Sequence, residues 1–105
     1  MTDDAFLVLA DKLLDSIQDM LDTCDLEVDW QRNDGVLTLV LADDSKVIIN
    51  RHLPNQEIWL AAKSGAFHFS LAPNQQWVNT RDGLTLTDTL AHLLDQASNG
   101  HTVSR

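Results

Sequence analysis

The sequence predicts an α+β fold, a two-layer α/β sandwich with N- and C-terminal helices packed on one face of an antiparallel sheet of about six strands. A segment at each end of the chain has apolar residues at helical spacing. Between them lie short segments of alternating apolar and polar residues, separated by turn residues. Short connections of this kind join antiparallel neighbours. We therefore expect residues 1–105 to form one domain.

The first expected element is an amphipathic helix over residues 3–22, with Thr2 or Asp3 able to cap its start. Its apolar face repeats at three- and four-residue steps and comprises Phe6, Leu9, Leu13, Ile17, Met20 and Leu21. The opposite face gathers carboxylates within an arc of about 80°. These carboxylates belong to Asp4, Asp11, Asp15, Asp19 and Asp22. The apolar face is expected to pack on the sheet and the acidic face to meet solvent.

Alternation of apolar and polar residues predicts the strands. In the first strand, residues 26–31, the side chains of Leu26, Val28 and Trp30 point inward. The tripeptide Asn33-Asp34-Gly35 that follows is a hairpin signal. Further strands are expected at residues 36–41, 46–51, 57–61, 66–71 and 76–79.

A second amphipathic helix follows the strands. Thr85 and Asp88 have the spacing of a capping box at its start. Its apolar face is formed by Leu86, Leu90, Leu93, Leu94 and Ala97. Gly100 is expected to end the helix.

The net charge of −9 is concentrated in the first third of the chain. Residues 1–34 hold ten acids and two bases, whereas residues 35–105 hold six acids and five bases. A surface this acidic repels nucleic acid and anionic membranes, so neither is expected as a partner. No apolar run is long enough to span a bilayer, and the acidic N-terminus is unlike a secretory signal. A single cysteine, Cys24, fits a reducing cytoplasm.

The sequence offers little support for catalysis. Cys24 has no neighbouring base, and the surrounding carboxylates disfavour its thiolate. The four histidines lack the spacing of metal ligands, and no glycine-rich phosphate loop is present. We therefore expect a protein that is not an enzyme.

An acidic ridge is the most unusual feature of the sequence. It comprises Asp11, Asp15, Asp19 and Asp22 on the first helix and Asp25, Glu27 and Asp29 beyond it. Like charges at helical spacing repel each other, and acids in the last helical turn oppose the helix dipole. We infer that the ridge binds a hard metal cation or a basic protein surface. This interpretation requires that the ridge carboxylates are not paired with lysines and arginines of the protein itself. The alternative is that the ridge is an exposed acidic face that only keeps the protein soluble.

Trp59 is the second unusual feature. Alternation in the strand 57–61 places Ile58 and Leu60 on one face and Trp59 on the other. If the helices cover Ile58 and Leu60, Trp59 stands on the open face together with Asn50 and Ile48, where an exposed indole is a common interface anchor. The alternative is that Trp59 belongs to the core.

Three segments carry a resemblance to a known family: Val47 to Pro54 (VIINRHLP), Ile58 to Ala61 (IWLA) and Gly65 to Phe69 (GAFHF). With the acidic helix before them and the second helix after them, they resemble the frataxin family over essentially the whole chain. The resemblance implies the predicted sandwich and a small iron-binding protein of iron–sulfur cluster assembly. In that family the acidic helix and first strand bind iron weakly and contact the cysteine desulfurase.

Carried over by position, the resemblance implies a set of metal-binding candidates: Asp11, Asp15, Asp19, Asp22, Asp25 and Asp29. It also implies a set of candidates for binding the cysteine desulfurase and the iron–sulfur scaffold protein: Asp19, Asp22, Glu27, Asn50 and Trp59. The chain departs from the family pattern at Gln18, Thr23, His52 and Glu57.

Three functions stay open at this point. The first is an iron-binding regulator that docks on the desulfurase, as a monomer or as an iron-induced oligomer. The second is a protein-interaction adaptor of the same complex that works without metal. The third is a ferroxidase, which the lack of a convergent buried site disfavours.

Overall fold

A helix, six strands and a second helix follow one another along the chain, as the sequence predicts. The computed structural model describes residues 1–23 and 28–103, with side chains described as far as residue 97. The elements are α1 (Asp3–Thr23), β1 (Asp29–Asn33), β2 (Val36–Val40), β3 (Lys46–His52), β4 (Glu57–Ala62), β5 (Gly65–Leu71), β6 (Trp77–Asn79) and α2 (Leu86–Val103).

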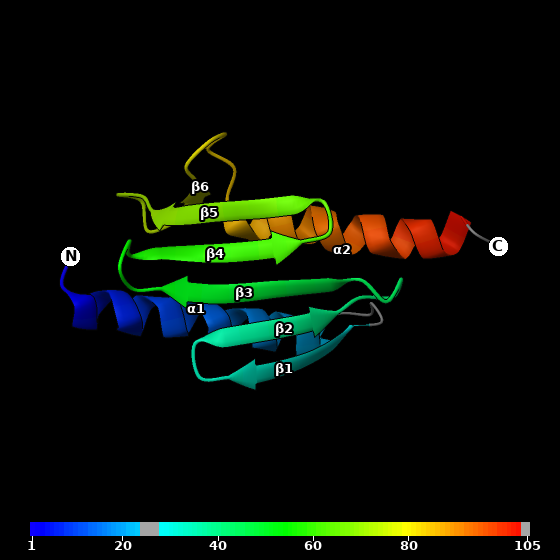
Figure 1. Ribbon diagram of the computed structural model, residues 1–105, viewed down its shortest axis with the longest axis horizontal. Helices are drawn as coiled ribbons and strands as arrows, with labels where there is room; N and C mark the ends of the chain where they lie inside the picture. The colour runs from blue at the N-terminus through cyan, green and yellow to red at the C-terminus, as the bar shows by residue number, and fades with distance from the viewer. Residues whose placement is uncertain (24–27, 104–105) are drawn as a thin grey trace.

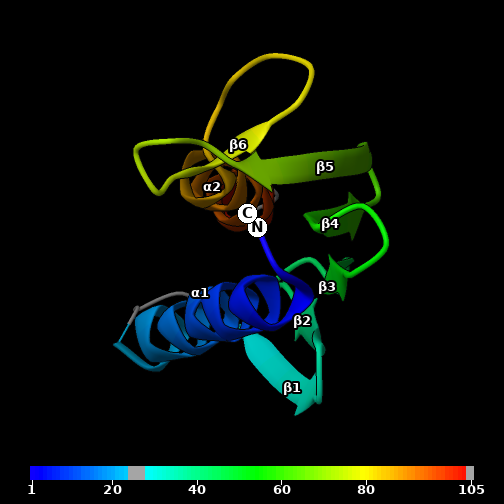
Figure 2. The ribbon, with the colours of Figure 1, turned by 90° about the vertical axis from the view of Figure 1, so that its left-hand side faces the viewer.

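The six strands form one antiparallel sheet in the order β1-β2-β3-β4-β5-β6, so each strand pairs with its neighbour in sequence (Figure 1). Both helices lie on the same face of this sheet, α1 beside the β1–β3 half and α2 beside the β5–β6 half (Figure 2). The other face carries no helix. The predicted two-layer sandwich is therefore confirmed.

The core lies between the sheet and the two helices. Alternate residues of the central strands, including Ile49, Ile58 and Leu60, are fully buried on the helix side. Phe6 of α1 packs edge-on against Trp77 of β6, with ring centroids 6.0 Å apart. The sequence pattern of period two therefore determines which sheet face is covered.

The buried stripe of α1 differs in part from the predicted one. Phe6, Ile17 and Leu21 are buried as expected, but Ala10 and Leu14 complete the stripe. The predicted Leu9 and Leu13 are only partly buried at its margin, and Met20 is exposed. The five buried residues are spaced by four, four, three and four positions, so they lie along a narrow line on the helix. The twisted sheet contacts the helix along that line.

The second helix continues beyond Gly100, so the prediction that this glycine ends it was wrong. Glycine in a helix interior costs about 1 kcal/mol relative to alanine, which weakens a helix without necessarily breaking it. In the part of the chain that the structure describes, no helix is both long and apolar enough to cross a bilayer.

Candidate functional site

The first half of the acidic ridge is neutralised within the protein. Asp11 forms ion pairs with Arg51 of β3 and Arg32 of β1, and Asp15 accepts a hydrogen bond from Arg32 at 2.8 Å. Both arginines project from the helix side of the sheet and have side chains only 18% and 20% exposed. The requirement that the ridge lack internal cationic partners is therefore not met at Asp11 and Asp15. Sequence spacing does not show that the two arginines would lie below α1.

Gly35 is the residue that makes room for Arg51. It lies in the β1–β2 turn and is buried, and its carbonyl accepts the Arg51 N–H at 3.0 Å. A Cβ atom at this position would come within 2.7 Å of Arg51 Cγ. The glycine of the predicted hairpin signal is thus needed for the close approach of the Arg51 side chain, whereas the positive φ of this turn, 53°, belongs to Asp34.

The second half of the ridge is not neutralised by cationic side chains of the described residues. Asp19 and Asp22 are exposed in the last two turns of α1, which has no basic residue in its final turn. Neither carboxylate has an ion pair among the described residues. Asp29 is exposed on β1 and, by alternation with the partly buried Trp30, lies on the open side of the sheet. Asp25 and Glu27 lie outside the described residues.

The ridge does not form a closed metal cage in residues 1–23 and 28–103. Within these ranges no three His, Cys, Asp or Glu side chains are grouped closely enough to hold one ion. Asp19 and Asp22 lie three residues apart on one face of α1 and supply only two unneutralised carboxylates. Carboxylates arranged this way suit a partly hydrated cation or a basic protein side chain better than a tightly chelated metal.

Trp59 lies on the open face, as expected. Its neighbours Ile58 and Leu60 are fully buried, whereas Trp59 is only partly buried. Asn50 stands opposite Trp59 in the β3–β4 register, and Ile48 is 41% exposed on the same face. This face therefore combines a large aromatic group with an amide and an aliphatic side chain.

Two imidazoles hold the Trp59 ring between them. His52 stacks on one side with ring centroids 3.7 Å apart and an interplanar angle of 9°, and His68 stacks at 4.5 Å and 12°. The indole N–H donates to Glu57 Oε1 at 2.9 Å, and the same oxygen lies 4.0 Å from His68 Nδ1. Sequence reasoning missed this arrangement, although the register of the two hairpins contains the signal: His68 and Trp59 are cross-strand partners.

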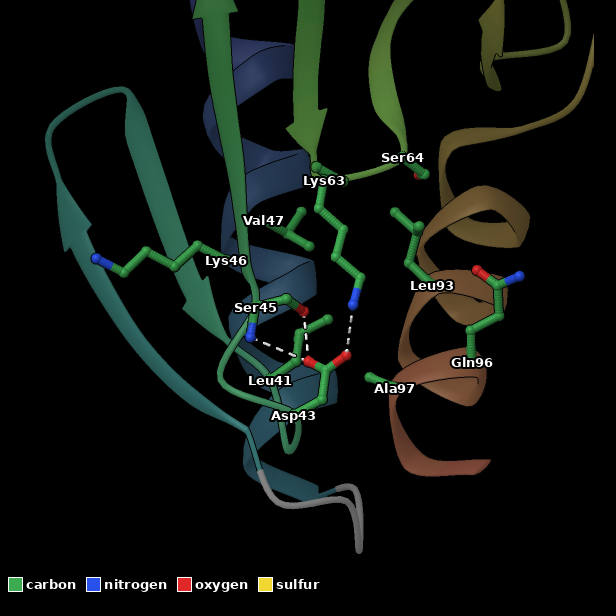
Figure 3. Close-up of a pocket in the computed structure, with 11 residues that line it drawn as sticks. Leu41, Asp43, Ser45, Lys46, Val47, Lys63, Ser64, Leu93, Gln96 and Ala97 are labelled. Carbon is green, nitrogen blue, oxygen red and sulfur yellow. Dashed lines mark hydrogen bonds and ion pairs between the residues drawn. The ribbon is translucent and has the colours of Figure 1, made fainter. Parts of the chain in front are cut away.

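A separate acidic side chain, Asp43, is occupied by internal donors. It lies in the β2–β3 turn beside a cavity of about 320 Å³ that the β4–β5 turn and α2 also line (Figure 3). Ser45 donates both its N–H and its hydroxyl to Asp43, and Lys63 donates at 3.1 Å. These donors, led by the Ser45 hydroxyl, lower the pKa of Asp43 to about 2. We therefore read Asp43 as a structural group that ties two turns together.

Comparison with known proteins gives a consistent result. A family model described as a frataxin-like domain matches residues 1–100. The iron-sulfur cluster assembly protein CyaY of Janthinobacterium sp. (strain Marseille) is 44% identical over 101 residues, covering 91% of this chain and 89% of that protein. CyaY of Neisseria meningitidis serogroup B is 40% identical over 98 residues, covering 93% of this chain and 91% of that protein.

Solved structures agree with the sequence relatives. The frataxin of Psychromonas ingrahamii superposes with a TM-score of 0.83 at 32% identity, covering 93% of each chain. The trimeric frataxin of Saccharomyces cerevisiae, in a crystal structure described as a ferrous complex, superposes with a TM-score of 0.74 at 36% identity. That match covers 85% of this chain and 84% of the yeast chain.

Proposed function

This chain belongs to the frataxin family, and on that premise we propose that it is an iron-binding accessory protein of iron–sulfur cluster assembly. It binds iron weakly at its surface and docks on the cysteine desulfurase and the iron–sulfur scaffold protein. It assists or regulates their reaction and contributes no catalytic residue of its own. The names of the curated relatives support the pathway, and the ferrous complex of the yeast relative supports the metal.

The observation that carries this proposal is the division of the ridge into a neutralised half and a charged half. Asp11 and Asp15 are paired with Arg32 and Arg51, so docking on a basic partner falls to the far end of α1. Asp19 and Asp22 there are exposed and oppose the dipole of their own helix. A cation bound at this end offsets both the mutual repulsion of the two carboxylates and their unfavourable interaction with the helix dipole. Asp29 extends the proposed cation surface beyond the helix, and Asp25 and Glu27, which lie outside the described residues, are candidates on the sequence alone.

The open sheet face supplies the second part of the proposed docking surface. Trp59 and Asn50 lie side by side on it, and a partly exposed tryptophan is the residue type most enriched among binding hot spots. We assign this part of the open face to the scaffold protein and the acidic end of α1 to the desulfurase. The two partners would then contact different sides of one small domain.

Binding to purified cysteine desulfurase, measured with and without Fe²⁺, tests the proposal. The double variant Asp19→Asn/Asp22→Asn should weaken binding at low salt. The matched control Asp4→Asn/Asp88→Asn changes the net charge equally at exposed positions in the first turns of α1 and α2, away from the last turn of α1, and it should bind like the wild type. Equal loss of binding in both double variants would mean that only net charge matters.

A second candidate function is the metal-independent adaptor. It is favoured by the lack of a three-ligand cluster in the described residues and by the internal pairing of Asp11 and Asp15. The two functions differ in an amide NMR titration with Fe²⁺. An iron-binding protein should show selective broadening at Asp19, Asp22 and Asp29, weaker at Asp11. An adaptor should show no selective broadening at millimolar iron, and its desulfurase binding should not change with iron.

A further inference from the structure

A polar pocket of about 280 Å³ lies at the edge of the sheet, away from the acidic end of α1. Its walls come from the first half of β5, the end of β6 and the turn that follows, namely Ala66, Phe67, His68, Asn79, Thr80 and Arg81. Because β6 pairs only with Phe69 to Leu71, the first half of β5 has no further strand beside it. Thr80 is held next to β5 by a hydrogen bond from its N–H to the His68 carbonyl at 3.0 Å. The pocket is therefore a defined hollow at an open strand edge.

Asn79 supplies a free hydrogen-bond donor to this pocket. It is a buried polar residue, only 5% exposed, and its Oδ1 accepts the Arg81 N–H at 2.8 Å. That bond fixes the orientation of the amide, so the other terminus is the NH₂ group. In the described part of the chain Nδ2 has no acceptor, and His52 Nδ1 is the only fully buried side-chain nitrogen or oxygen left there without a hydrogen-bond partner. Nδ2 must therefore retain access to solvent, and the pocket that Asn79 lines provides it.

The other polar groups of the pocket favour an anion. Arg81 is exposed, and its guanidinium has no ion pair with a carboxylate among the described residues. None of the lining residues is acidic, although the chain as a whole carries a net charge of −9. Thr80 and His68 also line the pocket. Arg81, with its unpaired guanidinium, and Asn79, with its unpaired amide donor, line one pocket that has no carboxylate in its wall, and this combination is complementary to an oxyanion.

We propose that this pocket binds a small oxyanion, a carboxylate or phosphate group, through Arg81 and the Nδ2 donor of Asn79. The guanidinium offers two parallel N–H groups to two oxygens of the anion, and Asn79 Nδ2 donates to one of them. The pocket volume is close to the lower limit of about 300 Å³ for small-molecule sites, which suits a small anion or one acidic group of a larger ligand. His68 joins the pocket to the docking face, because it lines the one and stacks on Trp59 in the other.

An NMR titration of the full chain with inorganic phosphate and, separately, with acetate tests the site. We expect saturable shifts of the Asn79 side-chain NH₂ and the Arg81 Nε–H, with smaller shifts at Thr80 and His68. A response to phosphate alone identifies a tetrahedral anion, and a response to acetate alone identifies a carboxylate. A response to both identifies a site for either group. Shifts that do not saturate with either salt, or that spread over the whole surface, overturn the proposal.

Two variants and one control make the test specific. Arg81→Gln keeps the backbone N–H that caps the turn but removes the charge, and it should weaken binding at least about tenfold, the effect of one lost charge-assisted hydrogen bond. Asn79→Asp keeps an oxygen for the Arg81 N–H but replaces the free donor by an acceptor, and it should abolish binding. Lys46→Gln removes an exposed charge that is outside the pocket and should bind normally. If Asn79→Asp fails to fold, Arg81→Gln alone decides, and wild-type affinity in that variant refutes the site.

Discussion

Replacing Asp19 and Asp22 together with asparagine should make the protein more stable. Both carboxylates are exposed near the C-terminal end of α1, where the backbone carbonyls carry partial negative charge and the last turn holds no basic residue. Each acid near a helix C-terminus costs about 0.3–1 kcal/mol, and a like-charge pair three residues apart costs about 0.2–0.5 kcal/mol more. The double variant should therefore gain about 1 kcal/mol in the free energy of unfolding.

For a chain of this size, a gain of about 1 kcal/mol raises Tm by roughly 4–8 °C. Thermal unfolding followed by circular dichroism at low salt measures it directly. Repeating the melt at about 1 M salt should remove most of the difference, because the Debye length falls to about 3 Å. Salt therefore separates a charge effect from a change in packing.

The single variant Asp15→Asn provides the control of opposite sign. Asp15 lies on the same helix face but is paired with Arg32 at 2.8 Å, so its loss should lower Tm slightly. Our reasoning fails if Asp19→Asn/Asp22→Asn lowers Tm, because the two acids would then contribute to the fold. It also fails if Asp15→Asn raises Tm as much as the double variant does.

Further predictions concern the ion-pair network and the Asp43 turn. Asp11→Asn should reduce the free energy of unfolding by about 1 kcal/mol in urea denaturation, because it leaves Arg51 without its main carboxylate partner. Gly35→Ala should cost a similar amount by displacing Arg51, and a double-mutant cycle with Asp11→Asn should show clear non-additivity; purely additive losses would refute the link. The pKa of Asp43 is lowered in the fold, so its contribution to stability should be complete above about pH 4 and be lost as the pH falls through about 2. Urea melts of wild type and Asp43→Asn across this range should therefore differ at neutral pH and converge in acid.

The fold was predictable because its signals are local. Alternation around Ile58 and Leu60 identified the covered face of the sheet, and the Asn33-Asp34-Gly35 turn identified the first hairpin. Short connections then left an antiparallel meander as the simplest arrangement. The end of α2 was missed because one glycine is a weak stop signal against the rest of a helix.

The candidate site was only partly predictable, because its charges are set by contacts distant in sequence. The exposure of Trp59 follows from its own strand. The neutralisation of Asp11 by Arg51 joins residues 40 positions apart, and it depends on how α1 crosses the sheet. No spacing rule within the helix contains that information. The free donor of Asn79 likewise depends on a hydrogen bond to Arg81 in a turn whose geometry the sequence does not specify.

The stacking of His52 and His68 on Trp59 reduces the conformational entropy that the indole loses when a partner docks. A large side chain that is mobile before docking loses about 0.5–1.5 kcal/mol of conformational entropy when a partner immobilises it. Here the two flanking rings and the Glu57 carboxylate already select one rotamer of the indole in the free protein. A partner would meet a rigid aromatic edge, so most of that entropic loss occurs during folding and does not weaken the complex.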